Sequence, residues 1–252
     1  MSGDALSGLR RLVAIMHRLR DPVAGCEWDI AQTFATIAPY TIEEAYEVAD
    51  AIARQDLPAL VDELGDLQLQ VVFHATIAEQ AGQFTLADVL AGVCDKLERR
   101  HPHIFGDGPT PGWEELKAAE RTALADSSAL AGIPVGAPAL MRAQKLQARA
   151  ARIGFDWPDA LGARDKVVEE LAEVDAAASE DERRDEVGDL LFAAVNLARK
   201  HGVDAEDALR QASRKFESRF RWMEAAEPGL ASKSLDEQEE LWQRAKVALR
   251  SV

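Results

Sequence analysis

Residues 169–173 read Glu-Glu-Leu-Ala-Glu, and residues 185–190 read Asp-Glu-Val-Gly-Asp-Leu. Nearly the same spelling occurs earlier, as Glu-Glu-Ala-Tyr-Glu at residues 43–47 and Asp-Glu-Leu-Gly-Asp-Leu at residues 62–67. Residues three or four apart share one face of an α-helix, so each E-x-x-E or E-x-x-D pair turns two carboxylates the same way. Their repulsion costs about 0.2–0.5 kcal/mol per exposed pair, and a bound divalent cation would remove that cost.

The hydrophobic pattern of the chain is helical. Apolar residues recur at spacings of three and four, alanine is abundant, and alternating β-branched runs are scarce, which favours helices over strands. The segments S-x-x-E at residues 179–182 and T-x-x-D at residues 85–88 have the form of capping boxes. Pro58 is typical of a first helical turn. The sequence therefore predicts an all-α protein.

The repeat extends beyond the acids. Residues 95–100 (DKLERR) match residues 214–219 (RKFESR), and three glycines and two prolines interrupt the chain between residues 106 and 112. We therefore predict tandem duplicated helical bundles. The expected domains are residues 1–107, a linker with a charged helix at residues 108–138 (the helix itself spanning residues 113–124), and residues 139–252.

Each copy has a glycine inside its acidic helix, Gly65 in the first and Gly188 in the second. A glycine inside a helix costs about 1 kcal/mol relative to alanine. We therefore expect a neighbouring helix or a ligand to approach closely at these two positions.

Composition limits the classes of partner. The 252 residues are 47% apolar, enough for a buried core, and carry a formal net charge of −15. This charge opposes binding to nucleic-acid polymers and anionic membranes, so we expect neither as a partner. Cys26 and Cys94 are too few for a zinc cluster or a disulfide framework and predict reduced thiols. With no apolar run of about 20 residues, the expected location is the cytoplasm.

Carboxylates without nearby histidine or cysteine favour hard cations, so we expect Mg²⁺, with Mn²⁺ as a substitute. Di-iron bundles of the ferritin type use Glu-x-x-His on helices. Neither copy has a histidine at that spacing, and His74 lies two turns beyond Asp66. The pairs Lys215 with Arg219 and Lys96 with Arg100 are four residues apart, a spacing that could present both cations to phosphate oxygens or simply decorate the surface.

In combination, these motifs resemble the MazG family of all-α nucleoside triphosphate pyrophosphohydrolases. The pattern is E-E-x-x-E followed by E-x-x-D, in tandem as in two-domain members. Further matching stretches are C-E-W-D at residues 26–29, DKLERRHPHIF at residues 95–105, PALMRAQK at residues 138–145 and G-F-D-W at residues 154–157. The resemblance covers nearly the whole chain. It implies an α-helical homodimer that cleaves nucleoside triphosphates to monophosphates and pyrophosphate with Mg²⁺.

The resemblance also implies site residues. The metal ligands would be Glu170, Glu173, Glu186 and Asp189, which with Glu169 make up the expected catalytic set. The nucleotide contacts would be Lys166, Val167, Val168, Glu169 and Glu170, the turn formed by Glu182, Arg183, Arg184 and Asp185, then Asp189, and finally Lys215, Phe216, Glu217, Ser218, Arg219 and Trp242.

The first copy keeps a second candidate metal site. Its acids are Glu44, Glu47, Glu63 and Asp66. Tyr40 precedes these acids where the second copy has Lys166, and no equivalent of Trp242 follows them. We therefore expect this first site to be weaker or structural.

Glu169 is the candidate base for the water that attacks the α-phosphorus, and Lys166, Lys215 and Arg219 would steady the leaving pyrophosphate. Another class of function is also compatible with amphipathic helices and a duplication. This is a non-catalytic helical scaffold or regulatory protein that binds metal or nucleotide. The base and sugar of the substrate, and any alarmone hydrolysis, stay open.

Overall fold

The computed structural model describes residues 5–106 and 128–249. Every regular element in these two ranges is a helix, so the all-α prediction is confirmed. Contacts divide the chain into two compact units, residues 1–116 and 117–252. The exact domain limits expected from the sequence stay a prediction, and the charged helix expected at residues 113–124 lies outside the described residues.

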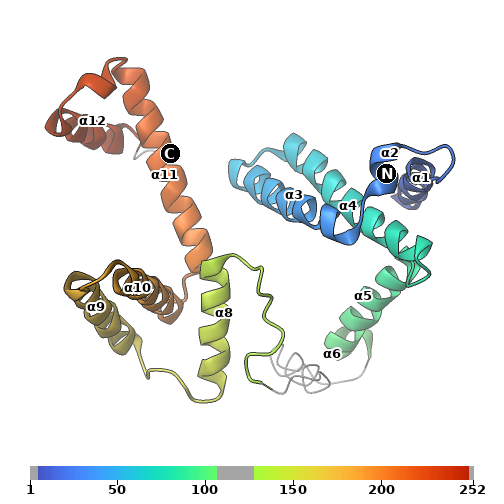
Figure 1. Cartoon of the computed structure of the whole chain (residues 1–252), viewed down its shortest axis with the longest axis horizontal. Coiled ribbons are helices and arrows are strands. Elements are labelled where there is room, and N and C mark those ends of the chain that lie inside the picture. The colour runs from blue at the N-terminus through green and yellow to red at the C-terminus, as the bar shows by residue number, and fades with distance from the viewer. Residues whose placement is uncertain (1–4, 107–127, 250–252) are drawn as a thin grey trace. The chain divides into compact units, whose positions relative to one another are not determined.

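The first unit is built on a helical hairpin. Helices α3 and α4 run antiparallel (Figure 1), and α1 packs against α4. Its buried core consists of Met16 from α1, Ile37 from α3, and Val72, Phe73 and Ile77 from α4. The elements of the unit are α1 (Ala5–Leu19), α2 (Glu27–Ala31), α3 (Phe34–Arg54), α4 (Leu57–Gln80), α5 (Leu86–Arg100) and α6 (Pro102–Phe105).

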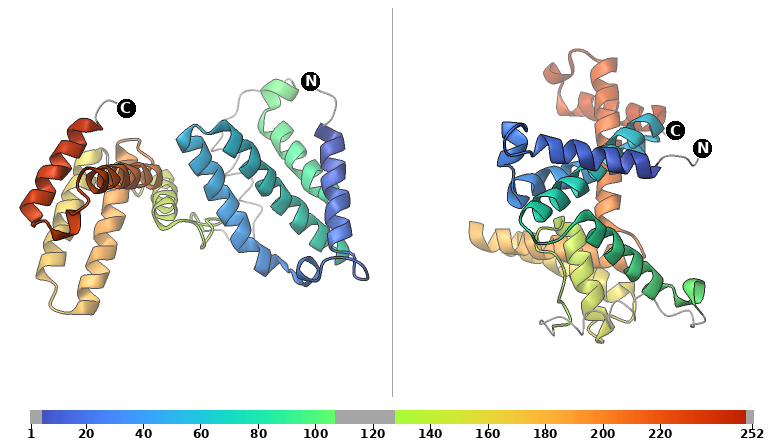
Figure 2. Two further views of the ribbon diagram at one scale, coloured as in Figure 1. Left: turned by 90° about the horizontal axis from the view of Figure 1, so that it is seen from above. Right: turned by 90° about the vertical axis from the view of Figure 1, so that its right-hand side faces the viewer.

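The second unit repeats the hairpin with α9 and α10, which Figure 2 shows from two further directions. Helix α8 packs against α10, while α12 folds back on the C-terminal part of α11. Met223, Leu230, Leu241 and Ala245 form the buried core between α11 and α12. The elements are α8 (Ala139–Arg152), α9 (Ala160–Ala176), α10 (Glu180–Lys200), α11 (Ala205–Ala226), the 3₁₀ turn η1 (Leu230–Ser232) and α12 (Leu235–Ala248).

The helix starts follow the sequence signals. Thr85 and Asp88 form a reciprocal capping box at the start of α5, and Pro58 lies in the first turn of α4. At α10, the Ser179 hydroxyl accepts a hydrogen bond from the Glu182 N–H. The Glu182 carboxylate, however, accepts from Ala178 N–H, one residue before the box position. Within the described ranges, no helix is long and apolar enough to cross a membrane.

Candidate active site

The acids of the second copy meet across the α9–α10 hairpin. Carboxylate oxygens of Glu170 on α9 and of Glu186 and Asp189 on α10 lie within 4.8 Å of one another. The short connection between the two helices folds them side by side, so faces that carry E-x-x-E and E-x-x-D in sequence become one cluster. Partial desolvation, followed by the negative charges of Glu170 and Glu186, raises the pKa of the Glu173 carboxyl. Glu173 is therefore the fourth acid beside this cluster.

Glu170 occupies the least solvated position of the four, with 3% of the residue exposed. Its Oε1 forms an ion pair of 2.6 Å with Lys166 Nζ, which also contacts Glu169 Oε1 at 2.9 Å. Its Oε2 is buried and, among the described residues, has no hydrogen-bond partner. A buried carboxylate oxygen without a partner is costly unless a cation binds it. The donor set, made only of carboxylates, suits Mg²⁺ or Mn²⁺.

The first copy has a matching cluster. Oxygens of Glu44, Glu63 and Asp66 also lie within 4.8 Å of one another. Partial desolvation and then the charge of Glu47 raise the pKa of the Glu63 carboxyl, which puts Glu47 beside the group. Burial and then Asp66 raise the pKa of Glu44, whose Oε2 is buried without a partner in the described part of the chain. Tyr40 on α3 holds the place that Lys166 holds on α9.

The remaining residues expected in the site divide into two groups. Val167, Val168 and Glu169 lie on α9 beside the cluster, with Val168 and Glu169 exposed. Residues 182–185 were expected to form a turn between helices. In the structure they belong instead to the first turns of α10. The Ser179 hydroxyl accepts a capping hydrogen bond from the Glu182 N–H, and α10 already begins at Glu180. The side chains of residues 182–185 therefore extend from a helix.

The second group lies on α11 and α12. Lys215, Phe216, Glu217, Ser218 and Arg219 are on α11, and Trp242 is on α12. The Arg219 guanidinium lies 5.6 Å from the centre of the Trp242 ring, and the Phe216 and Trp242 rings are 5.2 Å apart. A pocket lies beside the acids, and neither Lys215, Arg219 nor Trp242 lines it. Figure 1 shows α11, which carries Lys215 and Arg219, leading away from the α9–α10 hairpin.

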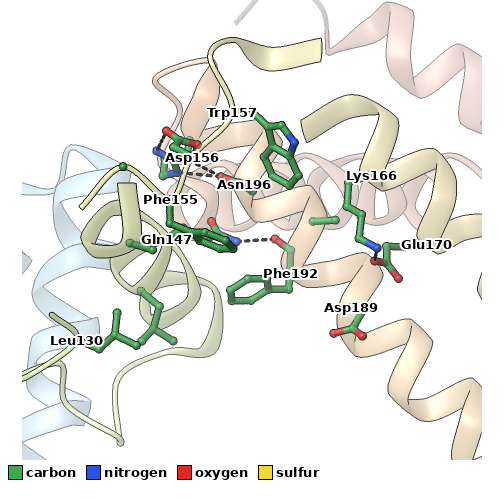
Figure 3. A pocket seen from close by; sticks show the side chains of 15 residues that line it. Leu130, Gln147, Phe155, Asp156, Trp157, Lys166, Glu170, Asp189, Phe192 and Asn196 are labelled. Atoms are coloured by element: carbon green, nitrogen blue, oxygen red, sulfur yellow. Dashed lines mark hydrogen bonds and ion pairs between the residues drawn. The ribbon is translucent and has the colours of Figure 1, made fainter. Parts of the chain in front are cut away.

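A pocket of about 710 Å³ adjoins the acidic cluster (Figure 3), a size typical of small-molecule sites. Lys166, Glu170 and Asp189 line one side, and Gln147, Phe155 and Leu130 lie on the other. The remaining lining residues are Leu146, Ala150, Gly154, Asp156, Trp157, Phe192, Ala193, Asn196 and Arg199.

Sequence reasoning did not single out Gln147, Phe192 or Asn196. A signal for two of them is present, because Phe192 and Asn196 follow Asp189 at spacings of three and seven and share its face of α10. Gln147 has no such signal, since α8 reaches the pocket only through its packing against α10.

Comparison with known proteins places both acidic clusters in one family. Residues 32–105 and 163–223 match the MazG nucleotide pyrophosphohydrolase domain. The nucleoside triphosphate pyrophosphohydrolase of Escherichia coli (strain K12) is 50% identical to this chain, covering 96% of this chain and 98% of its own length. The nucleoside triphosphate pyrophosphohydrolase/pyrophosphatase MazG of Thermotoga maritima is 46% identical, covering 93% of this chain and 94% of its own length.

A third relative, the uncharacterized protein YabN of Bacillus subtilis, is 42% identical over 92% of this chain and 50% of its own length. The two matched segments contain the two E-E-x-x-E and E-x-x-D pairs whose carboxylates converge in the structure. With the family match extending over more than half of the chain, this protein belongs to the MazG nucleotide pyrophosphohydrolase family.

Proposed function

We propose that the chain hydrolyses nucleoside triphosphates at the α-phosphorus, giving nucleoside monophosphates and pyrophosphate. Glu170, Glu173, Glu186 and Asp189 would hold Mg²⁺, with Mn²⁺ as a substitute. The observation that carries this proposal is the unpartnered, buried Glu170 Oε2 within a cluster made only of carboxylates, at the edge of a pocket. The names of the E. coli and T. maritima relatives support the same reaction.

When bound, Mg²⁺ would offset the charge of the triphosphate and lower the pKa of the attacking water. The protein's own groups position the reaction. Lys166 holds Glu170 and Glu169 in place, and these two carboxylates raise its pKa, so the amine stays charged and can contact a phosphate oxygen. Glu169 is exposed beside the cluster and is the candidate acceptor for the proton of the attacking water.

We also propose that the protein acts as a homodimer. Val168 and Leu171 on α9, Leu191 on α10 and Phe216 on α11 are each more than half exposed. Large apolar side chains exposed on neighbouring helices are typical of an interface between subunits. A two-fold dimer could bring the partner subunit's Lys215 and the partner subunit's Arg219 toward the acids, from which they are separate in one chain.

The first-copy cluster is proposed to be weaker or structural, because Tyr40 supplies no cation where Lys166 neutralises Glu170. The two free cysteines, Cys26 and Cys94, fit a cytoplasmic location, where thiols stay reduced.

Product analysis tests the reaction. The purified chain is incubated with Mg²⁺ and a panel of ribo- and deoxynucleoside triphosphates, and the products are separated. Monophosphate with pyrophosphate is the expected result, and diphosphate with phosphate would overturn cleavage at the α-phosphorus. Absence of turnover, together with Mg²⁺-dependent nucleotide binding in a thermal melt, would favour the non-catalytic binding protein.

A matched pair of variants tests the ligand assignment. Glu173→Ala should lower turnover by orders of magnitude, because Glu173 is one of the four acids at the proposed site. Glu47→Ala changes the equivalent acid of the first copy and should have a much smaller effect. Wild-type turnover by Glu173→Ala would contradict the assignment.

A further inference from the structure

We propose that the pocket between α8 and α10 binds the nucleobase of the substrate and that Gln147 recognises an N–H group of that base. The inference rests on the proposed function for the orientation of the substrate. It adds a base-recognising residue that lies outside both segments matched by the family.

The face of α10 that lines the pocket starts at the acids. Asp189, Phe192 and Asn196 follow one another along this face, and Asn196 lies roughly 10 Å beyond Asp189 along the helix axis. A triphosphate held at Glu170 and Asp189 would therefore have its nucleoside directed along this face. The far part of the pocket is lined by apolar and aromatic side chains, among them Phe155 and Phe192, which suit the faces of a flat ring.

Gln147 supplies a polar group of fixed orientation. The residue is only 7% exposed, and its Nε2 donates a hydrogen bond of 2.8 Å to the Phe192 carbonyl oxygen. That contact distinguishes the two ends of the amide and makes Oε1 an acceptor. Oε1 is buried and has no partner among the described residues. A buried acceptor beside a pocket, with nothing in the chain to satisfy it, points to a ligand that donates an N–H.

Asn196 complements this acceptor. Its Oδ1 accepts hydrogen bonds from Arg199 Nε at 2.9 Å and Arg199 Nη2 at 2.7 Å. Arg199 is itself held by Asp156, through contacts of 2.6 and 3.1 Å. The oxygen end of the Asn196 amide is thereby engaged, which leaves its NH₂ group as the donor for the pocket.

The pocket thus offers one fixed acceptor and one donor between aromatic side chains. Nucleobases carry both an N–H donor and a ring or carbonyl acceptor on one edge. A triphosphate without a base has acceptor oxygens only and offers no N–H donor to Gln147. The class of ligand assigned to this pocket is therefore a nucleobase. Through the side-chain amides of Gln147 and Asn196, the pocket would contribute to substrate affinity separately from the chemistry at the acids.

The test compares Gln147→Met and Phe155→Ala with the wild type on nucleoside triphosphates and on inorganic tripolyphosphate. For Gln147→Met we expect kcat/KM for nucleoside triphosphates to fall by about tenfold or more, mainly through KM, because the contact is equal in ground and transition states. Hydrolysis of tripolyphosphate should be unchanged. Phe155, which is 80% exposed, tolerates truncation without disturbing the core, so Phe155→Ala should show the same pattern.

Gln70→Met is the matched control. Gln70 on α4 is also 7% exposed and also has a buried, unpartnered Oε1, but it belongs to the first unit. Its substitution should leave KM unchanged. The proposal would be overturned if Gln147→Met lost kcat/KM equally on nucleotides and on tripolyphosphate. It would also be overturned if KM for nucleotides were unchanged in both Gln147→Met and Phe155→Ala.

Equilibrium binding separates this inference from the proposed reaction. Calorimetric titration with nucleoside monophosphates needs no turnover, and we expect Gln147→Met to weaken binding by about tenfold. If the wild type bound monophosphates through Gln147 but hydrolysed nothing, the base pocket would stand and the proposed reaction would fail. If the wild type hydrolysed nucleoside triphosphates but Gln147→Met bound monophosphates as tightly as the wild type, the proposed reaction would stand and the base pocket would fail.

Discussion

The role of a residue in the acidic cluster depends on its solvation as much as on its type. Glu169 and Glu170 are neighbours in sequence, yet Glu169 is exposed and Glu170 is buried. Lys166 partly compensates for burying Glu170, through Oε1. The other oxygen has no partner among the described residues. This asymmetry supports the proposal that Glu170 is a metal ligand and that the exposed Glu169 accepts the proton.

In the metal-free protein, Glu186→Gln should raise the melting temperature, because it removes one of the negative charges that raise the pKa of Glu173. A carboxyl with a raised folded-state pKa destabilises the fold above that pKa, and the penalty disappears on acidification. The difference in melting temperature between Glu186→Gln and the wild type should thus be largest near neutral pH. It should shrink as the pH falls toward the ordinary glutamate pKa of 4.5.

Thermal melts in chelator and in Mg²⁺ provide the measurement. In Mg²⁺ the order should reverse, because the wild type gains more from the ion. A variant that melts below the wild type in chelator would contradict repulsion within the cluster.

Asp156→Asn should lower the free energy of unfolding by about 1 kcal/mol at neutral pH, the upper end for ion pairs of this kind. Hydrogen bonding to Arg199 comes first among the causes that lower the pKa of the Asp156 carboxyl. The stability from this pair is therefore present above the ordinary aspartate pKa of 3.8 and is lost as pH falls through the lowered value. Urea unfolding of the wild type and of Asp156→Asn at pH 7 and pH 3 is the measurement. If the variant lost the same free energy of unfolding at both pH values, the contribution of this ion pair would be refuted.

At the scale of the element, α10 carries both proposed binding sites on adjoining parts of one face. Its N-terminal half carries Glu186 and Asp189, and its C-terminal half carries Asn196 and Arg199. The glycine between the two acids was expected to allow a neighbouring helix or a ligand to approach closely. A Cβ added at Gly188 or Gly65 would meet no described atom within 4 Å, so no helix of the described chain makes that approach.

Gly188→Ala should therefore stabilise the isolated chain by about 0.5–1 kcal/mol, because alanine loses less backbone entropy in a helix and has space for its methyl group. Urea unfolding at low protein concentration is the measurement, with Gly65→Ala as the equivalent change on α4. Destabilisation at Gly188, accompanied by weaker self-association, would instead place a second subunit against this position.

At the scale of the whole molecule, the residues expected to contact phosphate lie in two places. The acids and Lys166 belong to the α9–α10 hairpin, whereas Lys215 and Arg219 lie on α11, where Arg219 packs over Trp242. Among the described residues, neither Lys215 nor Arg219 lines the pocket beside the acids. The homodimer is the proposed way to bring these cations and the acids together.

Mixing inactive chains tests this arrangement. Glu173→Ala and Lys215→Ala homodimers should each have low activity, but a mixed dimer would contain one site with both residues intact. After denaturation and joint refolding in equal amounts, activity should recover to about a quarter of the wild type, because about half of the dimers are mixed. No recovery, despite mixed dimers seen by native mass spectrometry, would show that each site is complete within one chain.

The sequence by itself determined the helical class, the duplication and the two sets of acids. These properties follow from local periodicity and spacing, which act within one helix. It also indicated where α4 and α5 begin, because capping depends on adjacent residues, although residues 182–185 proved helical once Ser179 capped α10.

Only the tertiary structure decided which side chains meet across helices. Glu170 became the buried acid, and Gln147 came to lie beside Phe192, 45 residues later in the chain. The separation of Lys215 and Arg219 from the pocket was likewise invisible in the spacing of residues. The physical reason is that helical spacing fixes which residues share a face, while packing between helices fixes what that face meets and how far water is excluded from it.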